Sequence, residues 1–173
     1  MIVKSFEIKK IQLEKNPFVL LYGKNEGHKN QIKIELLRNK TITLKYEEKE
    51  VLNNLDNFTE SLYTKSLFEN EKLIIINRAT DKIFKILSEI IDKKIKDLIF
   101  IIDADNLEKK SKLRSFFEND KNCICIPFYA DTDQTLYKIG SEYLKRKNIP
   151  ISTSNLNLII NQCNGDRKIL LME

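Results

Sequence analysis

The amino-acid sequence predicts an α/β fold, with a parallel sheet between helices, followed by a small all-helical domain. Short apolar runs without polar alternation predict the sheet, because this pattern is typical of strands covered on both faces. Segments with apolar residues at helical spacing separate these runs, and a repeated βα pattern favours parallel strands. After Pro127 the helical spacing dominates. We therefore expect an α/β domain over residues 1–130 and a helical domain over residues 131–173.

Strands and helices alternate along the first domain. We expect strands over residues 18–21, 41–46, 72–77, 98–102 and 122–127. The segments between them predict helices over residues 31–37, 47–63, 81–91 and 108–118. Asn57 is expected to break the second of these helices, and Thr80 to cap the third. Cys123 and Cys125 alternate along the last strand, so we expect both side chains to point the same way and to be buried.

Three helices are predicted in the second domain. Asp131 and Gln134 have the spacing of a capping box ahead of the first helix. The remaining boundaries are Pro150 as a break, Ser154 as a cap, Gly165 as a stop and Asp166 as the start of a last helix that runs to Glu173. That last helix is short and apolar and is marginal by itself. We therefore expect the natural chain to continue beyond it.

The composition is that of a globular protein with a basic surface. The net charge is +5 and the sequence pI is about 9.0. Because basic residues alternate with acidic ones, we interpret this charge as a solvated surface that permits a nucleic-acid partner without indicating one. The three cysteines show no metal-ligand spacing. No signal peptide or membrane-spanning run is present, so we expect a cytoplasmic protein with no membrane partner and no bound metal.

The strand, glycine turn and helix around residues 18–37 have the order of parts of a phosphate-binding P-loop. In the pattern G-x-x-x-x-G-K-[ST], Gly23 and Lys29 match. His28 replaces the second glycine and brings a side chain where the backbone would curl around phosphate. Asn30 replaces the hydroxyl that ligates Mg²⁺. We interpret the turn as a tight βα connection, a nucleotide-binding frame without its chemistry, and expect no cofactor.

This frame, followed by a helical domain, resembles the layout of AAA+ modules. Their Walker-B strand has four apolar residues followed by Asp-Glu. Here residues 99–102 lead into Asp103 and Ala104, so the metal-binding aspartate is present and the glutamate that polarises water is absent. Asp105 would point to the opposite face of an extended strand. Asp103 and Asp105 either share a metal or cap the following loop, and the second interpretation is favoured. We expect no ATP hydrolysis.

Ser66, Leu67 and Phe68 form a short stretch between polar residues, where a predicted helix ends and the next strand has not begun. Adjacent apolar residues at the end of an element have two interpretations. Leu67 and Phe68 either tuck under the neighbouring strand or protrude as an apolar plug for the pocket of a partner. The sequence leaves both open.

Along its whole length, the sequence resembles the delta subunit of the bacterial DNA polymerase III clamp loader. The resemblance rests on five stretches in a fixed order: Leu20-Leu21-Tyr22-Gly23, Ser66-Leu67-Phe68, Lys110-Ser111-Lys112-Leu113-Arg114 with Phe117, Pro127-Phe128-Tyr129-Ala130-Asp131, and Gly165-Asp166-Arg167-Lys168. Members of that family have an inactive AAA+-like domain, a helical lid domain and a C-terminal collar domain. We therefore expect this chain to stop before the collar.

The resemblance implies a mechanical role. Such a subunit binds the ring-shaped sliding clamp (beta subunit) and favours its open form during DNA replication. It implies partnership with the delta prime and tau/gamma subunits and with DNA, and no catalytic site of the subunit's own within a DNA-directed DNA polymerase, a nucleotidyltransferase. By position, Leu67 and Phe68 would enter a hydrophobic pocket of the clamp, with Ser66 at the base of the plug.

Other residues take on expected roles from the same resemblance. Gly23, Lys29, Asp103 and Arg167 would be remnants of a nucleotide site. Arg167 matches the lid arginine that active AAA+ modules direct at nucleotide, and we expect it to pair with Asp166 or to cap a helix instead. A basic group either approaches DNA phosphates or forms a solvated helix start; its members are Lys109, Lys110, Lys112 and Arg114. Two alternative functions remain, an active P-loop NTPase and a basic nucleic-acid-binding module.

Overall fold

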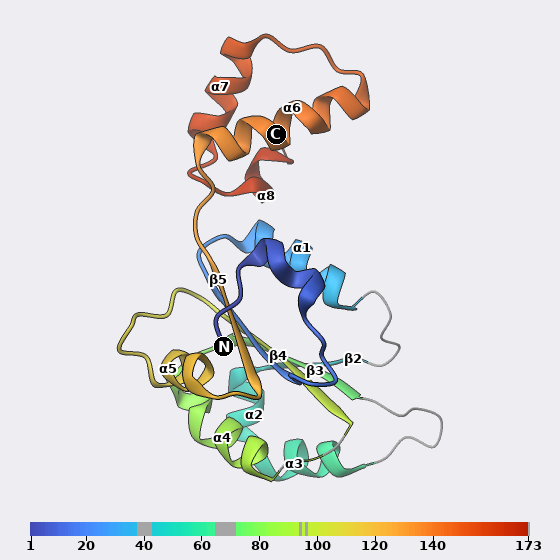
Figure 1. Cartoon of the computed structure of the whole chain (residues 1–173), viewed down its shortest axis with the longest axis vertical. Helices are drawn as coiled ribbons and strands as arrows, with labels where there is room; N and C mark the ends of the chain where they lie inside the picture. The colour runs from blue at the N-terminus through green and yellow to red at the C-terminus, as the bar shows by residue number, and fades with distance from the viewer. Residues whose placement is uncertain (38–42, 65–71, 94, 96, 173) are drawn as a thin grey trace. The chain divides into compact units, whose positions relative to one another are not determined.

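The computed structural model describes residues 1–37, 43–64, 72–93, 95 and 97–172. It contains a five-stranded parallel sheet with the strand order β2-β3-β4-β1-β5 (Figure 1). The strands are β1 (Phe18–Gly23), β2 (Thr43–Glu47), β3 (Lys72–Ala79), β4 (Leu98–Ala104) and β5 (Cys123–Phe128). The predicted α/β class is confirmed, and each predicted strand is found, with the ends that can be compared shifted by no more than two residues; residues 41 and 42 of the second predicted strand lie outside the described residues.

The central strands are buried on both faces, as their unbroken apolar runs predict. Every residue of β1 and of β4 is buried. The two strands are neighbours, and the rings of Phe18 and Phe100 stack with their centroids 5.1 Å apart. Alternate residues such as Val19 and Ile101 point to the other face and are also buried. Burial on both faces is what excludes water from this sheet and explains why polar alternation is missing.

Helices cover one face of the sheet from the side shown at the bottom of Figure 1. They are α2 (Glu48–Asn53), α3 (Leu55–Tyr63), α4 (Phe84–Asp92) and α5 (Lys112–Asn119), with a short 3-10 helix η2 (Asp81–Ile83) before α4. Phe58, Leu87 and Phe117 of these helices belong to one buried cluster with the strands. Cys123 and Cys125 lie in the same cluster as free thiols, and burial raises the pKa of each to about 12. Their predicted burial is confirmed.

The N-terminal segment runs beside β5. Ile2 forms a parallel bridge with Cys125, and the ammonium group of Met1 donates a hydrogen bond to the carbonyl oxygen of Cys123 at 2.8 Å. The 3-10 helix η1 (Ser5–Lys10) follows. These contacts pair backbone groups at the edge of the sheet that would otherwise stay exposed.

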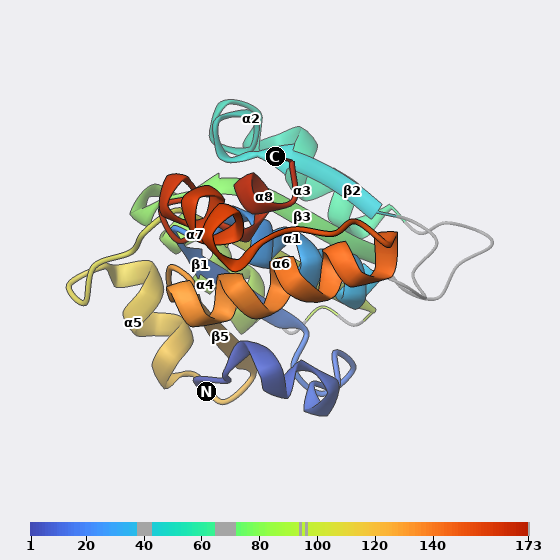
Figure 2. The same ribbon diagram turned by 90° about the horizontal axis from the view of Figure 1, so that it is seen from above.

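The chain forms two compact units. The first comprises Met1–Tyr22 and Leu37–Pro127, and the second comprises Gly23–Leu36 and Phe128–Glu173. The second unit contains α1 (Glu26–Leu37), α6 (Asp133–Lys147), α7 (Thr153–Gln162) and α8 (Arg167–Leu170). In it, α6 packs against α7 and α8 (Figure 2). Because α1 belongs to the helical unit, this division differs from a single boundary at residue 130.

Several helix boundaries in the first unit differ from the prediction. The helical stretch after β2 breaks at Asn54, whose backbone has φ −133° and ψ 56°, so the predicted break at Asn57 is wrong. α5 begins at Lys112 rather than at residue 108, because the Ser111 hydroxyl accepts the N–H of Arg114 and caps the helix there. The predicted cap at Thr80 is confirmed: its side chain accepts the N–H of Lys82 at the start of η2.

The caps of the helical unit also differ from the prediction. Thr132, rather than Asp131 with Gln134, caps α6, because its hydroxyl accepts the N–H of Thr135 at 3.2 Å. Ser152 caps α7 in the same way, so the predicted cap at Ser154 is wrong. Asp166 caps α8 as its predicted start implies, but α8 ends at Leu170 instead of running to Glu173. α1 begins at Glu26, earlier than residue 31.

Candidate functional site

The candidate site is the turn between β1 and α1, where a P-loop would hold phosphate. β1 ends at Gly23, whose φ is 128°, and α1 begins at Glu26. Only Lys24 and Asn25 lie between them, so the connection is a tight βα turn. A Cβ on Gly23 would lie 2.0 Å from the carbonyl oxygen of Phe128. Gly23 is therefore required by its conformation and by the backbone beside it, without any ligand.

The Asn25 side chain fills this turn and is almost completely buried. Its Nδ2 donates to the carbonyl oxygen of Tyr129 at 3.1 Å and to Oδ2 of Asp131 at 2.8 Å. Its Oδ1 accepts the N–H of His28, in the first turn of α1, at 3.0 Å. Asn25 thus uses donors and an acceptor to tie the start of α1 to the chain around residue 130.

Arg167 forms a two-pronged ion pair with Asp131. Nε donates to Oδ2 at 2.8 Å and Nη2 donates to Oδ1 at 2.5 Å, a geometry that matches a guanidinium to a carboxylate. The third nitrogen, Nη1, donates to Oε1 of Gln31 at 3.0 Å. The expected pairing of Arg167 with Asp166 is therefore wrong, because Asp131 holds the guanidinium while Asp166 caps α8. We call Asn25, Asp131, Arg167 and Gln31 the carboxylate network.

The Asp131 carboxylate is ionised at neutral pH. Burial raises its pKa, but hydrogen bonds from Arg167 and Asn25 outweigh this effect and hold the pKa below the ordinary value. A permanent anion therefore sits between the arginine of α8 and the asparagine of the βα turn.

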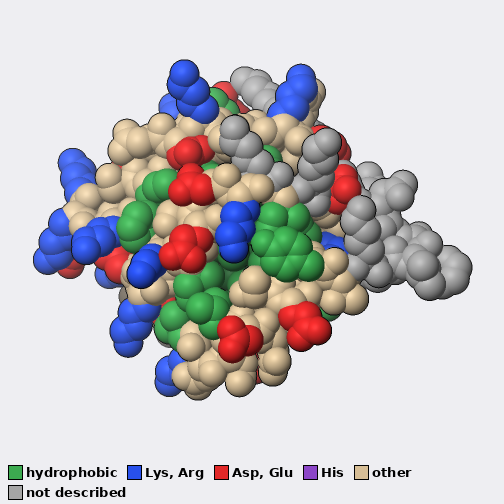
Figure 3. Space-filling model, turned by 90° about the horizontal axis from the view of Figure 1, so that it is seen from below, with side chains coloured by type: hydrophobic (Ala, Val, Ile, Leu, Met, Phe, Trp, Pro, Cys, Tyr) green, Lys and Arg blue, Asp and Glu red, His purple; other side chains and the backbone are tan. Residues whose placement is uncertain are grey.

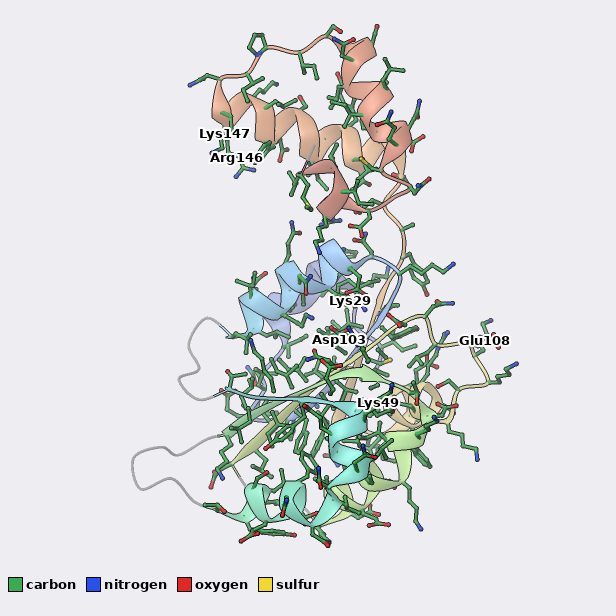
Figure 4. The ribbon with its side chains drawn as sticks, turned by 180° about the vertical axis from the view of Figure 1, so that it is seen from behind. Lys29, Lys49, Asp103, Glu108, Arg146 and Lys147 are labelled. Carbon is green, nitrogen blue, oxygen red and sulfur yellow. The ribbon has the colours of Figure 1, made fainter. Side chains whose placement is uncertain are left out.

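Lys29 occupies the position of the P-loop lysine on α1 (Figure 4) and is 1% exposed. Its Nζ lies 2.5 Å from Oε1 of Glu26, one helical turn earlier. A buried ammonium group is stable only with partners, so this ion pair helps to hold the side chain in place. The P-loop lysine is thus present, and one of its partners is a carboxylate of its own helix.

His28, at the position of the second P-loop glycine, turns its ring against the protein. The ring lies edge-on to Phe128, with the centroids 5.1 Å apart. Burial, and then the neighbouring Arg167 charge, lower its pKa to about 4, although Asp131 acts in the opposite direction. The imidazole is therefore neutral at physiological pH.

Gly27, which the P-loop pattern leaves unspecified, sits where α1 meets α8. A Cβ at Gly27 would lie 2.6 Å from the backbone nitrogen of Lys168 and 2.8 Å from a carboxylate oxygen of Asp166. The backbone of α8 would therefore have to move to make room for any side chain at position 27. The glycine therefore permits close helix packing, a role that pattern matching alone does not reveal.

Asp103, the remnant of the Walker-B position, is 7% exposed at the carboxyl end of β4 (Figure 4). Asp105 follows β4 and is exposed. Within the described residues, no group of three or more His, Cys, Asp or Glu side chains is arranged to hold a metal ion. The same pattern, four apolar residues before two acidic ones, also fails in β3, where Asn77 and Arg78 follow the apolar run.

The basic residues in and just before α5 differ in their exposure and in their partners. Lys109, Lys110 and Lys112 are exposed, and Lys110 pairs with Glu108 at 2.9 Å. Arg114 instead donates to Glu118 at 2.8 Å and lies over the ring of Tyr22 at 4.9 Å. The face in Figure 3 likewise mixes basic, acidic and apolar side chains. On α6, the labelled Arg146 and Lys147 (Figure 4) belong to the last turn, where positive charge favours the helix dipole.

The expected clamp-binding residues Ser66, Leu67 and Phe68 lie outside the described residues. Described residues before and after this stretch are joined by hydrogen bonds. Lys72 donates through Nζ to the carbonyl oxygens of Ser61, at 2.8 Å, and of Thr64. These are orphan carbonyl groups at the end of α3, so Lys72 caps that helix.

A pocket of about 520 Å³ lies at the amino ends of the strands. Pro17 and Phe18 before and in β1, Leu98 in β4 and Asn122 before β5 line it. In open α/β sheets, ligands bind beyond the carboxyl ends of the strands. This pocket is therefore not the counterpart of the βα-turn site.

The carboxylate network was missed by sequence reasoning. Gly23 and Lys29 could be found because a local pattern contains both. Asp131 was assigned to a helix cap because capping is a local signal, whereas its partners Asn25 and Arg167 are 106 and 36 residues away. An asparagine two residues after the turn glycine is the one local sign, since Asn side chains often bond to nearby backbone in turns.

No protein-family model matches the sequence. No curated protein matches it either. Among the described residues, no helix is long and apolar enough to cross a membrane.

Solved structures match the fold at low sequence identity. A Bacillus subtilis DNA clamp loader delta protein has a TM-score of 0.63 and 15% identity, covering 96% of this chain and 53% of that one. A variant of Thermotoga maritima RuvB has a TM-score of 0.62 and 15% identity, covering 97% and 57%. Domain III of the Thermotoga maritima replication initiation protein DnaA has a TM-score of 0.53 and 13% identity, covering 96% and 76%.

These likenesses show the fold alone. The chain shares the α/β fold of these structures and spans about half the length of the clamp loader delta protein and of RuvB.

Proposed function

We propose that this chain is a clamp-loader subunit of the delta type, which binds a sliding clamp and favours its open form without hydrolysing ATP. The fold likeness to a clamp loader delta protein supports this proposal, as does the resemblance of the five sequence stretches quoted above to that family. On this proposal its partners are the clamp, the delta prime and tau/gamma subunits, and DNA in the assembled loader.

The carboxylate network is the observation that supports an ATP-independent role. Asp131 holds the Arg167 guanidinium, and Asn25 fills the turn. The glutamate expected of a Walker-B strand is missing after Asp103, and His28 and Asn30 replace the glycine and hydroxyl of the loop. Groups that an NTPase would direct at nucleotide are thus bound to protein or replaced.

The proposed clamp contact consists of Leu67 and Phe68. Burial of these two side chains in a pocket would contribute about 3–6 kcal/mol before ordering costs are subtracted. Such a contact opens a ring only if it binds the open form more tightly than the closed one.

A calorimetric titration of purified sliding clamp tests the proposal. The wild-type chain should bind clamp equally well with and without ATP and Mg²⁺. Combined Leu67→Ala and Phe68→Ala should weaken binding roughly 100-fold or more, because the buried apolar area is lost. The matched control combines Leu158→Ala with Met172→Ala, two exposed apolar residues of the helical unit, and should bind like the wild type.

Two outcomes would contradict the proposal. If the titration detects no binding between the clamp and the wild-type chain, with or without ATP, the proposed clamp-binding role is wrong. Saturable ATP binding that disappears on Lys29→Ala in a folded variant would favour the NTPase instead.

A further inference from the structure

The donors around Asp131 are arranged as they would be around a bound oxyanion. Two nitrogens of Arg167 and one of Asn25 converge on its carboxylate at 2.5–2.8 Å. The side chains of Arg167 and Asp131 are 12% and 6% exposed, so water competes little for these bonds. A planar guanidinium fork fits a phosphate group as well as it fits a carboxylate.

The donors are held in place by contacts that do not involve Asp131. Gln31 accepts a hydrogen bond from Nη1 of Arg167 at 3.0 Å. Asn25 accepts the N–H of His28 through Oδ1, which turns its Nδ2 toward the carboxylate. If the carboxylate were removed, a preorganised and largely buried guanidinium would therefore stay without its anion, which is costly.

The location favours a negative charge as well. Asn25 immediately precedes α1, a helix of 12 residues, and the N-terminus of a helix favours anions. Asp131 already supplies that charge at neutral pH, so a second anion would meet repulsion from the first.

We propose that Arg167 and Asn25 form an anion-binding site whose ligand in this chain is the protein's own Asp131 carboxylate. Inorganic phosphate occupies the site only when that carboxylate has been removed. This inference does not depend on clamp binding, because every residue it uses lies in the helical unit.

Thermal unfolding in increasing inorganic phosphate, with ionic strength held constant by chloride, tests the site. Wild type should show no saturable response. Asp131→Ala should unfold at a lower temperature in chloride and regain roughly 3–6 °C, saturably, at phosphate about tenfold above its dissociation constant. The matched control is Asp133→Ala, which removes an exposed carboxylate nearby and should respond like the wild type.

A second variant tests whether the response comes from the proposed donors. Asp131→Ala combined with Arg167→Gln should lose the phosphate response. If Asp131→Ala does not fold in chloride, the larger Asp131→Asn side chain is used, and phosphate should stabilise it more than Asp133→Asn. The proposal is overturned if the folded Asp131 variants ignore phosphate, if Asp133→Ala responds equally, or if the response survives the loss of Arg167.

Discussion

His28 shows how a single position has changed its chemistry. A phosphate-binding loop has glycine there, so that the backbone can approach the ligand. In this protein the imidazole lies edge-on to Phe128, and Arg167 and Asp131 are the charged groups that act on it. Burial outweighs the other effects, and the ring stays neutral in the folded chain down to a pH of about 4.

We expect acid to destabilise the protein through His28. In the unfolded chain its pKa is 6.5, whereas in the folded chain it is about 4, so below pH 6.5 the unfolded state takes up a proton that the folded state does not. The contribution of His28 to the free energy of unfolding should therefore be constant above pH 6.5. It should fall by on the order of 1–3 kcal/mol as the pH drops from 6.5 to 4, and should not change further below pH 4.

Urea denaturation between pH 7.5 and 4 measures this slope. His28→Gln, which cannot take up a proton in this range, should flatten the curve between pH 6.5 and 4. Asp131, whose folded pKa lies below the ordinary value of 3.8, loses its contribution mainly below that pH and should affect this range little. An unchanged slope in His28→Gln would contradict the assignment.

At the scale of elements, capping decides where helices begin. Two serines compete to start α7 in the sequence, Ser152 and Ser154. In the structure only Ser152 has the extended backbone of a cap, with φ −73° and ψ 151°, and its hydroxyl accepts the N–H of Asn155. Ser154 lies inside the helix and is exposed.

We expect Ser152→Ala to lower the free energy of unfolding by about 1 kcal/mol, because the N–H of Asn155 loses its partner. Ser154→Ala is the matched control and should change stability by less than about 0.5 kcal/mol in either direction. Chemical denaturation of the two variants checks the difference. Equal effects would show that the hydroxyl of Ser152 does not stabilise α7.

The strands were more predictable than the helix starts, of which those at Thr80 and Asp166 agree with the prediction, for a physical reason. A strand buried on both faces needs only apolar side chains, which the runs in β1 and β4 display directly. A helix start depends on which of several polar residues takes extended backbone angles, and residues such as Thr132 and Asp131 are equally suitable by composition. Asp131 was lost as a cap because Arg167, far along the chain, binds its carboxylate.

The candidate site was half predictable on the same grounds. The erosion of the phosphate loop follows from the identities of His28 and Asn30 at fixed positions of a pattern. What replaced the phosphate does not follow, because Asn25, Asp131 and Arg167 meet only in three dimensions. Burial is also not visible in the sequence, which does not show that Lys29 is 1% exposed while Lys24, five residues earlier, is exposed.

For the whole molecule, charge is the property that bears most directly on partners. The net charge of +5 is spread over both units, and exposed lysines lie near acidic residues, as with Lys110 and Glu108. Dispersed charge of this kind gives weak, sequence-independent attraction to nucleic acid. It does not by itself form a binding site.

We expect the isolated chain to bind duplex DNA weakly. The logarithm of the affinity should fall with the logarithm of salt concentration with a slope shallower than about −2, since few phosphates are contacted at once. Replacing Lys109, Lys110 and Lys112 by Gln should change this slope little more than replacing Lys145, Arg146 and Lys147, the matched control on α6. Fluorescence anisotropy measures both.

A steep slope that becomes shallower by about 3 only in the α5 variant would contradict this expectation. It would show that these three lysines contact phosphates together, and would favour the nucleic-acid-binding module over the clamp-binding subunit.

The discontinuous helical unit has a consequence for biosynthesis. During translation, α1 is synthesised long before its hydrogen-bond partners. Asp131, the partner of Asn25, follows 106 residues later, and Arg167, the partner of Gln31, follows 136 residues later. In a nascent chain that has emerged only as far as β5, the first turn of α1 has neither the carboxylate nor the guanidinium that hold it. The start of α1 therefore gains these hydrogen bonds only after translation has reached α8.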